Sequence, residues 1–221
     1  KKNSTMLALN SSYPNYGYMG IPLCILAFSE KASIPISLIL IFDTIVLLSF
    51  TSFFIDYGTK NSYYNEIKYL IIKIFTNPIL IGSLFGIFFV LFNIELNNFI
   101  YNFFEILSKA ATPTALFAIG INLYKKVENI SFSNIFYISI SKLIVHPFLV
   151  FIVFYFYNVD VSILWIKVAI LCASLPIAGN VFAMSIYYNC FTKSTSSSIL
   201  ITTVLSTISV PFILFMLLNY L

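Results

Sequence analysis

Ser12-Tyr-Pro14-Asn-Tyr-Gly17 and Ser174-Leu-Pro176-Ile-Ala-Gly179 share the order Ser-x-Pro-x-x-Gly, and each interrupts a long apolar stretch. Proline removes a backbone donor and clashes with the preceding helical turn, while glycine lets the backbone unwind. A membrane helix normally avoids such a combination. A matched pair of broken helices in corresponding halves of a polytopic protein is the best sequence indication of a transporter binding site.

The composition supports a membrane setting for these two segments. The chain of 221 residues is 60% hydrophobic and only 9% charged, whereas a soluble domain has about a quarter charged residues. Long apolar runs separated by short polar clusters favour helices over the alternating pattern of an outer-membrane barrel. We therefore expect an all-α membrane protein embedded in the lipid bilayer, with no separate soluble domain.

The apolar runs predict about seven membrane spans, of which the first and the sixth are the broken ones. Their connections are short, so neighbouring spans should run antiparallel. The longest polar stretch follows the second span, between Asp56 and Lys68. The predicted spans cover residues 4–28, 33–55, 68–92, 99–123, 131–157, 162–188 and 196–219.

The lysines predict how these spans are oriented. All 12 basic residues are lysines, and only Lys31 clearly falls on the side opposite to the lysine-rich one. The positive-inside rule makes the lysine-rich side cytoplasmic. We expect a cytoplasmic loop at 57–68 and a non-cytoplasmic C-terminus in the cell membrane. The lysines on the predicted cytoplasmic side are Lys1, Lys2, Lys60, Lys68, Lys125, Lys126 and Lys193.

An internal repeat links the two interruptions. A shift of about 162 residues places Pro14 on Pro176 and Gly17 on Gly179. The number of intervening spans is odd, so the related halves should face opposite ways across the membrane, as in inverted-repeat transporters.

This repeat predicts a domain organisation. Residues 1–56 would end the first repeat with two spans, the first broken at Pro14. Residues 69–221 would form the second repeat with five spans, the fourth broken at Pro176. A complete protein would be an inverted five-plus-five repeat of ten spans. We therefore expect a chain that is N-terminally truncated to about seven spans.

The two breaks define the candidate solute site, which is not catalytic. Unwound backbone groups and the positive N-terminal ends of half-helices could hold an anion at a crossover near mid-membrane. The amides of Asn15 and Asn180 offer polar contacts without the desolvation cost of a charge. Two alternatives stay open: ordinary proline kinks, and asparagines that only satisfy the broken backbone. The candidate solute-binding residues are Pro14, Asn15, Gly17, Pro176, Gly179 and Asn180.

Four ionisable residues lie well inside predicted spans, where charges are costly and usually face a cavity or each other. Glu105 and Lys109 are spaced i, i+4, which favours a structural ion pair. Asp43 is the better candidate for coupling, because an intramembrane carboxylate can exchange a proton or bind a cation. Lys142 could pair with Asp43 or attract an anionic solute, and the sequence leaves both roles open.

Several other classes of function lack support. The single histidine, His146, precedes Pro147, and we favour a structural hydrogen bond to a freed carbonyl over a proton relay. Gly-x-Ser-x-Gly, His-Glu-x-x-His and Walker sequences are absent, and so is a basic, aromatic nucleic-acid surface. The three cysteines lack metal-ligand or disulfide spacing. We expect neither an enzyme nor a protein with a cofactor, a metal site or a nucleic-acid partner.

Three further motifs carry a resemblance to a known family. Pro14-Asn-Tyr-Gly-Tyr-Met-Gly-Ile-Pro22-Leu23 resembles the fourth-span signature of the auxin efflux carrier family. Thr112-Pro113-Thr-Ala-Leu-Phe-Ala-Ile-Gly120 resembles its seventh span, and Leu175-Pro176-Ile-Ala-Gly-Asn180-Val-Phe-Ala-Met184 its ninth.

The resemblance implies an inverted five-plus-five permease that transports organic anions such as dicarboxylates or auxin. It also implies that Pro14, Asn15 and Pro176 line the solute site, and that the termini face outward. Coupling to protons, coupling to Na⁺ and uncoupled transport all stay open, as does a homodimer. The alternative function is a non-transporting truncated remnant, which an early stop codon in the DNA upstream of Lys1 would favour.

Overall fold

The structure is a computed structural model that describes residues 2–56, 78–124, 132–157 and 161–220. Within these ranges the regular secondary structure is helical. The extended pairing found there is one isolated antiparallel bridge, between Pro14 and Ile177. The predicted all-α class is therefore confirmed.

The N-terminal part contains the first interrupted helix. Helix α1 (Lys2–Ser12) ends just before Pro14, and the chain resumes as the π-helical turn η1 (Tyr16–Gly20) and helix α2 (Ile21–Phe28). A short 3₁₀ turn, η2 (Glu30–Ala32), leads into α3 (Ser33–Asp56), which is long enough to cross a bilayer. The break at Pro14 lies where the sequence predicts it.

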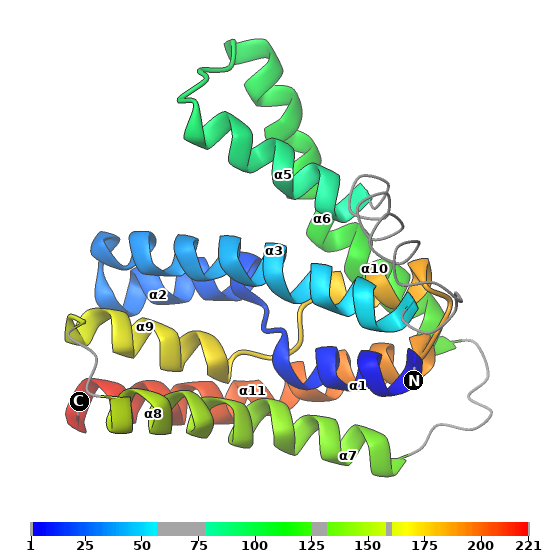
Figure 1. The fold of residues 1–221 in the computed structure, drawn as a ribbon, viewed down its shortest axis with the longest axis vertical. Helices are drawn as coiled ribbons and strands as arrows, with labels where there is room; N and C mark the ends of the chain where they lie inside the picture. Colours follow the sequence, from blue (N-terminus) through cyan, green and yellow to red (C-terminus); the bar gives the residue numbers. More distant parts are fainter. Residues whose placement is uncertain (1, 57–77, 125–131, 158–160, 221) are drawn as a thin grey trace, which may run out of the picture.

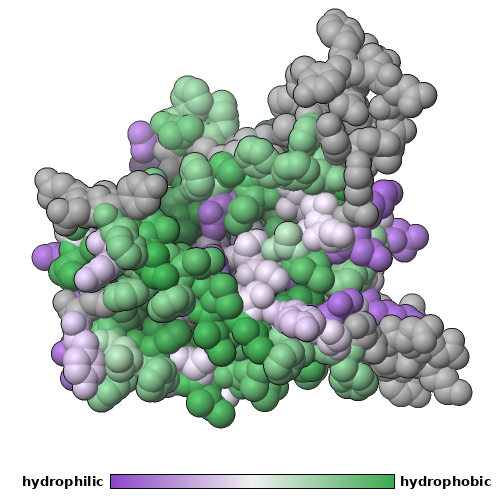
Figure 2. Space-filling model, turned by 60° about the horizontal axis from the view of Figure 1, so that its bottom comes forward, coloured by the Kyte–Doolittle hydropathy of each residue, from purple (hydrophilic) through white to green (hydrophobic). Residues whose placement is uncertain are grey.

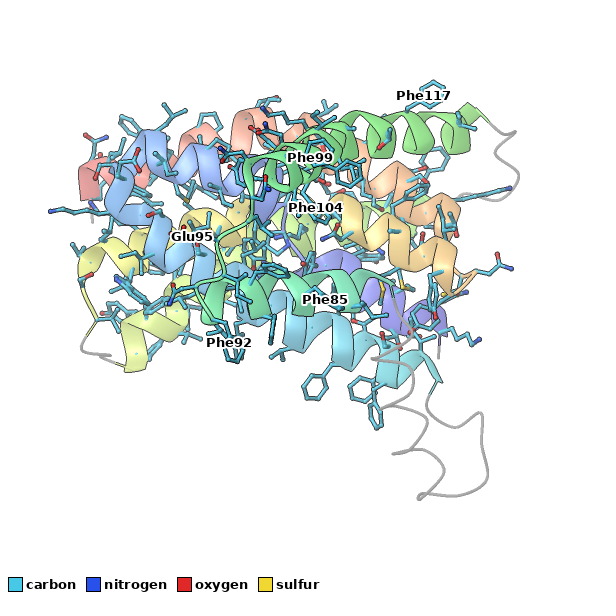
Figure 3. All side chains as sticks on the ribbon, turned by 90° about the horizontal axis from the view of Figure 1, so that it is seen from above. Phe85, Phe92, Glu95, Phe99, Phe104 and Phe117 are labelled. Carbon is cyan, nitrogen blue, oxygen red and sulfur yellow. The ribbon has the colours of Figure 1, made fainter. Side chains whose placement is uncertain are left out.

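Helices α5 (Pro78–Leu91) and α6 (Asn98–Tyr124) form a hairpin that projects away from the other helices (Figure 1). Its aromatic side chains are largely exposed, with Phe99 at 81%. In the view from above, Phe99, Phe104 and Phe117 follow α6, which crosses over the helices beneath it (Figure 3). An exposed aromatic surface of this kind suits a lipid environment or a protein neighbour.

The C-terminal part contains the second interrupted helix. Helix α7 (Phe132–Ile140) continues through the π-helical turn η3 (Ser141–Val145) into α8 (His146–Tyr157). Helix α9 (Ile163–Ser174) stops before Pro176, and α10 (Gly179–Tyr187) starts after it. The last helix, α11 (Thr192–Tyr220), continues through Pro211 without a break. π-Helical turns often mark functional sites, and here both lie close to an interruption.

Three helical segments of the described chain are long and apolar enough to cross a membrane: Glu30–Ile55, Phe132–Phe156 and Thr192–Tyr220. The predicted first and sixth spans are each divided into shorter helices by their breaks. The predicted fourth span corresponds to α6, and the end of the third to α5. Residues 68–77 and the predicted loop at 57–68 lie outside the described residues, so the count of seven spans stays a prediction.

One face of the molecule matches a lipid-facing surface. Figure 2 shows that hydrophobic residues predominate on the side where α7, α8 and α11 lie. The exposed side chains on these helices include Phe136, Phe148, Phe151, Phe212 and Phe215. A soluble protein rarely exposes so large a contiguous apolar area, which agrees with an integral membrane protein.

Within the described ranges, the buried hydrophobic side chains form two clusters, one on each side of the breaks. The first joins α1 and α10 through side chains that include Met6, Tyr13, Ile177 and Met184. The second joins α2 and α9 through side chains that include Tyr16, Cys24, Leu171 and Leu175. The two broken segments thus pack against each other from both ends, which brings Pro14 and Pro176 together.

Candidate functional site

The two interruptions meet as a short antiparallel backbone pair. The Asn15 N–H donates to the Pro176 carbonyl at 2.8 Å, and the Ala178 N–H donates to the Tyr13 carbonyl at 3.3 Å. Leu175 and Ala178 are extended, with ψ values of 153° and 151°. Each break therefore satisfies part of the backbone that the other leaves open, which membrane burial requires.

A side chain of α11 satisfies another freed group. The N–H of Ile177 would donate to Ala173 in an unbroken helix, but here it points to the Thr202 hydroxyl oxygen at 3.4 Å. Thr202 is fully buried and donates its own hydrogen to the Ser198 carbonyl at 2.7 Å. Nothing in the sequence marks Thr202 for this role, because a threonine in an apolar helix is ordinarily satisfied by its own backbone.

The C-terminal end of α9 is capped by a buried cation. Lys142 has no exposed surface, and its ammonium donates to the Ala173 carbonyl at 2.7 Å. Its Nζ also lies 3.0 Å from His146 Nδ1, which is 3.2 Å from the same carbonyl. A positive charge is favourable at the negative end of a helix.

This cap bears on the roles that the sequence leaves open for His146 and Lys142. His146 has a structural contact, as expected, although the carbonyl concerned is freed by the break at Pro176 and not by Pro147. Lys142 contacts Ala173 and His146, and the described ion pairs do not include one with Asp43.

A cavity of about 330 Å³ opens beside the crossover. It is lined mainly by the two broken segments, with Leu40 from α3 and Ser108 from α6 completing the wall. All of the predicted solute-binding residues except Pro176 line it; the Pro176 carbonyl instead holds the Asn15 N–H. The lining residues from the broken segments are Tyr13, Pro14, Asn15, Tyr16, Gly17, Tyr18, Ala178, Gly179 and Asn180.

The amide oxygen of Asn15 has a structural role. Its Oδ1 caps η1 by accepting from the Tyr18 N–H, at a long distance of 3.4 Å. Within the described part of the chain, neither the Asn15 Nδ2 nor the Asn180 amide forms a side-chain hydrogen bond in the structure. Both asparagines line the cavity, where an amide NH₂ can donate to a solute.

The two glycines of the repeat, Gly17 and Gly179, line the cavity. Gly17 is not crowded by neighbouring atoms. A Cβ added there would meet nothing within 4 Å, so the space does not require glycine. Gly20, which the sequence analysis does not single out, is closer to its neighbours: a Cβ would lie 3.0 Å from the side chains of Ile36 and Leu175. A side chain at Gly20 would therefore require the ends of the Ile36 and Leu175 side chains to shift.

Asp43 is connected to the crossover through an aromatic side chain. The Tyr16 hydroxyl on η1 donates to the Asp43 carboxylate on α3, and Tyr16 also lines the cavity. The structure thus places a carboxylate one side chain away from the candidate solute site. The other predicted pair, Glu105 and Lys109, is confirmed at 2.7 Å on an exposed face of α6.

Replacing Asp43 by asparagine is expected to abolish gradient-driven solute accumulation more than solute binding. Asparagine keeps the size of the side chain but cannot carry the charge or exchange a proton with it. The measurement is accumulation against a gradient, compared with equilibrium binding, in the same vesicles. Glu105→Gln serves as a control because that carboxylate is paired on an exposed surface. Normal accumulation by Asp43→Asn would exclude Asp43 as the coupling group.

Sequence comparison identifies similar membrane transport proteins. The profile of a family described as "membrane transport protein" matches residues 1–214. A protein of Rhizobium meliloti (strain 1021) named "Putative malonate transporter" is 30% identical over 215 residues. The alignment covers 96% of this chain and 67% of that relative.

Proposed function

The chain belongs to the membrane transport protein family, and from this premise we propose that it is a secondary carrier for small organic anions. The carrier works by alternating access around the crossover of the two broken helices. The observation that carries the proposal is the antiparallel pairing of Pro14 with Ile177 beside a cavity of about 330 Å³. Broken helices of this kind are typical of transporter solute sites.

A short dicarboxylate is the solute class that we propose. The cavity walls combine backbone groups of the unwound segments with the uncharged amides of Asn15 and Asn180. Such donors bind a carboxylate without a buried counter-charge that would have to be desolvated. The name of the Rhizobium relative refers to malonate, a dicarboxylate, and this supports the same class.

The architecture that we propose around this site is an inverted five-plus-five repeat. A shift of 162 residues places Ser11, near the end of α1, on Ala173, near the end of α9. The two helix ends therefore occupy corresponding positions, although Lys142 caps only the end of α9. Asp43 and Lys142 remain the candidates for ion coupling. A homodimer also remains a prediction.

Uptake by vesicles that contain the reconstituted full-length gene product tests the proposed function. Labelled malonate, succinate and a monocarboxylate are supplied while pH and Na⁺ are varied independently. We expect saturable uptake of at least one dicarboxylate, inhibited by the unlabelled compound. A correctly inserted protein that moves none of these acids would favour the non-transporting alternative.

The orientation of the chain gives a separate prediction. Asn61→Cys and Leu221→Cys are introduced singly into a protein whose native cysteines have been replaced. Because lysine-rich segments stay in the cytoplasm, a membrane-impermeant maleimide applied to intact cells should label position 221 and leave position 61 unlabelled. The opposite labelling pattern would reverse the proposed topology. Permeabilised cells provide the control that both positions can react.

A further inference from the structure

We propose that the C-terminal half of α1 and the start of α11 form a binding site for Na⁺. The ligands are Asn10 Oδ1 and Ser198 Oγ, with Thr195 Oγ1 between them. The inference rests on the proposed carrier function, for which it supplies the coupling ion. It arises from buried oxygen atoms that the fold leaves without partners.

The Asn10 side chain is held in one orientation. Asn10 has no exposed surface, and its Nδ2 donates to the Met6 carbonyl at 2.7 Å and to Thr195 Oγ1 at 3.0 Å. Exchanging the two amide atoms would set Oδ1 against the Met6 carbonyl, so this assignment is the favourable one. Oδ1 then has no hydrogen-bond partner among the described residues. A buried acceptor left in this way costs about 1–3 kcal/mol.

Ser198 differs from several hydroxyl residues of α11 and shares its lack of a partner with Ser209 in the second half of that helix. Ser196, Thr203 and Ser206 each donate to a carbonyl of their own helix three or four residues earlier. Ser198 is also fully buried, yet its Oγ has no partner in the described part of the chain. Its oxygen is therefore available to something other than the helix backbone.

Helix geometry brings these oxygens together. Thr195 and Ser198 are three residues apart and so lie on one face of α11, with Cβ atoms about 5–6 Å apart. Thr195 Oγ1 already contacts the Asn10 amide. A third unpartnered buried oxygen, Ser139 Oγ, lies on α7, which packs against both α1 and α11. Figure 1 shows α1 and α7 running close to each other on this side of the molecule.

The local potential favours a positive charge. The break at Pro14 removes the helical partners of the Asn10 and Ser11 carbonyls, because Pro14 has no N–H and Asn15 donates to Pro176. The last turn of α1 contains no basic residue, whereas the corresponding end of α9 has the Lys142 ammonium. Half-helix C-terminal ends with freed carbonyls are places where transporters coordinate Na⁺.

Binding of radioactive Na⁺ to the purified full-length gene product, measured without solute, tests this site. Wild-type protein should bind Na⁺ saturably, and excess unlabelled Na⁺ but not choline should displace it. Asn10→Ala and Ser198→Ala should each weaken Na⁺ affinity roughly tenfold or more, since each removes a contact to a charge. Ser196→Ala is the matched control, because Ser196 is equally buried on α11 but bonded to Thr192.

The outcomes separate this inference from the proposed function. Solute transport by a protein without saturable Na⁺ binding would overturn the Na⁺ site alone, and an ordered water would then satisfy the three oxygens. Unchanged Na⁺ affinity in folded Ser198→Ala protein would overturn the assigned ligands. Saturable Na⁺ binding that both variants weaken would support the site even if none of the tested acids is transported.

Discussion

Pro176→Ala is expected to abolish transport while leaving the protein in the membrane. Proline in a helix interior is about 3 kcal/mol less favourable than alanine, so the substitution removes the main obstacle to a continuous helix from α9 into α10. A re-formed helix would withdraw the Pro176 carbonyl from Asn15 and the Ala178 N–H from Tyr13. The crossover that frames the cavity would then be lost.

Pro211→Ala is the matched control for this experiment. Pro211 lies inside α11, which remains helical through it. Replacing it by alanine therefore leaves both helix interruptions unchanged. We expect Pro211→Ala to retain transport. Hydrogen exchange at Ile177 and Ala178 reports directly whether the second break has closed in Pro176→Ala. Transport at the wild-type rate by Pro176→Ala would show that the break is not needed.

Asn15→Ala is expected to weaken solute binding roughly tenfold to a hundredfold. The loss of one hydrogen bond to a charged group costs about 1.5–3 kcal/mol, which corresponds to that range of dissociation constants. Asn15 lines the cavity, and its contacts within the described chain are made by its backbone and Oδ1, which leaves Nδ2 for a solute. Equilibrium binding of labelled dicarboxylate to the reconstituted protein measures the effect.

Asn15→Asp separates the two roles of this side chain. Aspartate retains the oxygen that caps η1 at the Tyr18 N–H, so the local fold should persist. It replaces the donor by a negative charge, and its repulsion of a carboxylate should weaken solute binding further than alanine does. If both variants fold and bind solute as the wild type does, Asn15 does not contact the solute.

The local sequence is sufficient to place the two breaks. Pro14 and Pro176 cannot donate within a helix and clash with the turn before them, and each is followed three residues later by a glycine, which lets the backbone unwind. The Ser-x-Pro-x-x-Gly order therefore predicts an interruption at both places, whereas Pro211, which lacks it, leaves α11 continuous. α1 accordingly ends at Ser12 and α9 at Ser174. The i, i+4 spacing of Glu105 and Lys109 is likewise local, and their ion pair is confirmed.

The partners of the freed backbone groups depend on contacts distant in sequence. Asn15 donates to Pro176, and Ile177 to Thr202 on α11. Lys142 holds the Ala173 carbonyl, although its depth in the membrane suggested a carboxylate or an anionic solute as partner. The residue type limits which groups a side chain can bind, but several residues of the chain offer the same chemistry. The sequence therefore does not identify which of them is the partner.

Sequence alone therefore determined that this is a helical membrane protein with two interrupted helices, because hydrophobicity and proline geometry act locally. The tertiary structure decided that the interruptions pair and that Tyr16 links Asp43 to the crossover. It also decided that Asn10 and Ser198 keep oxygens without a partner in the described part of the chain. These features depend on helix packing, which brings residues from different helices within hydrogen-bonding distance.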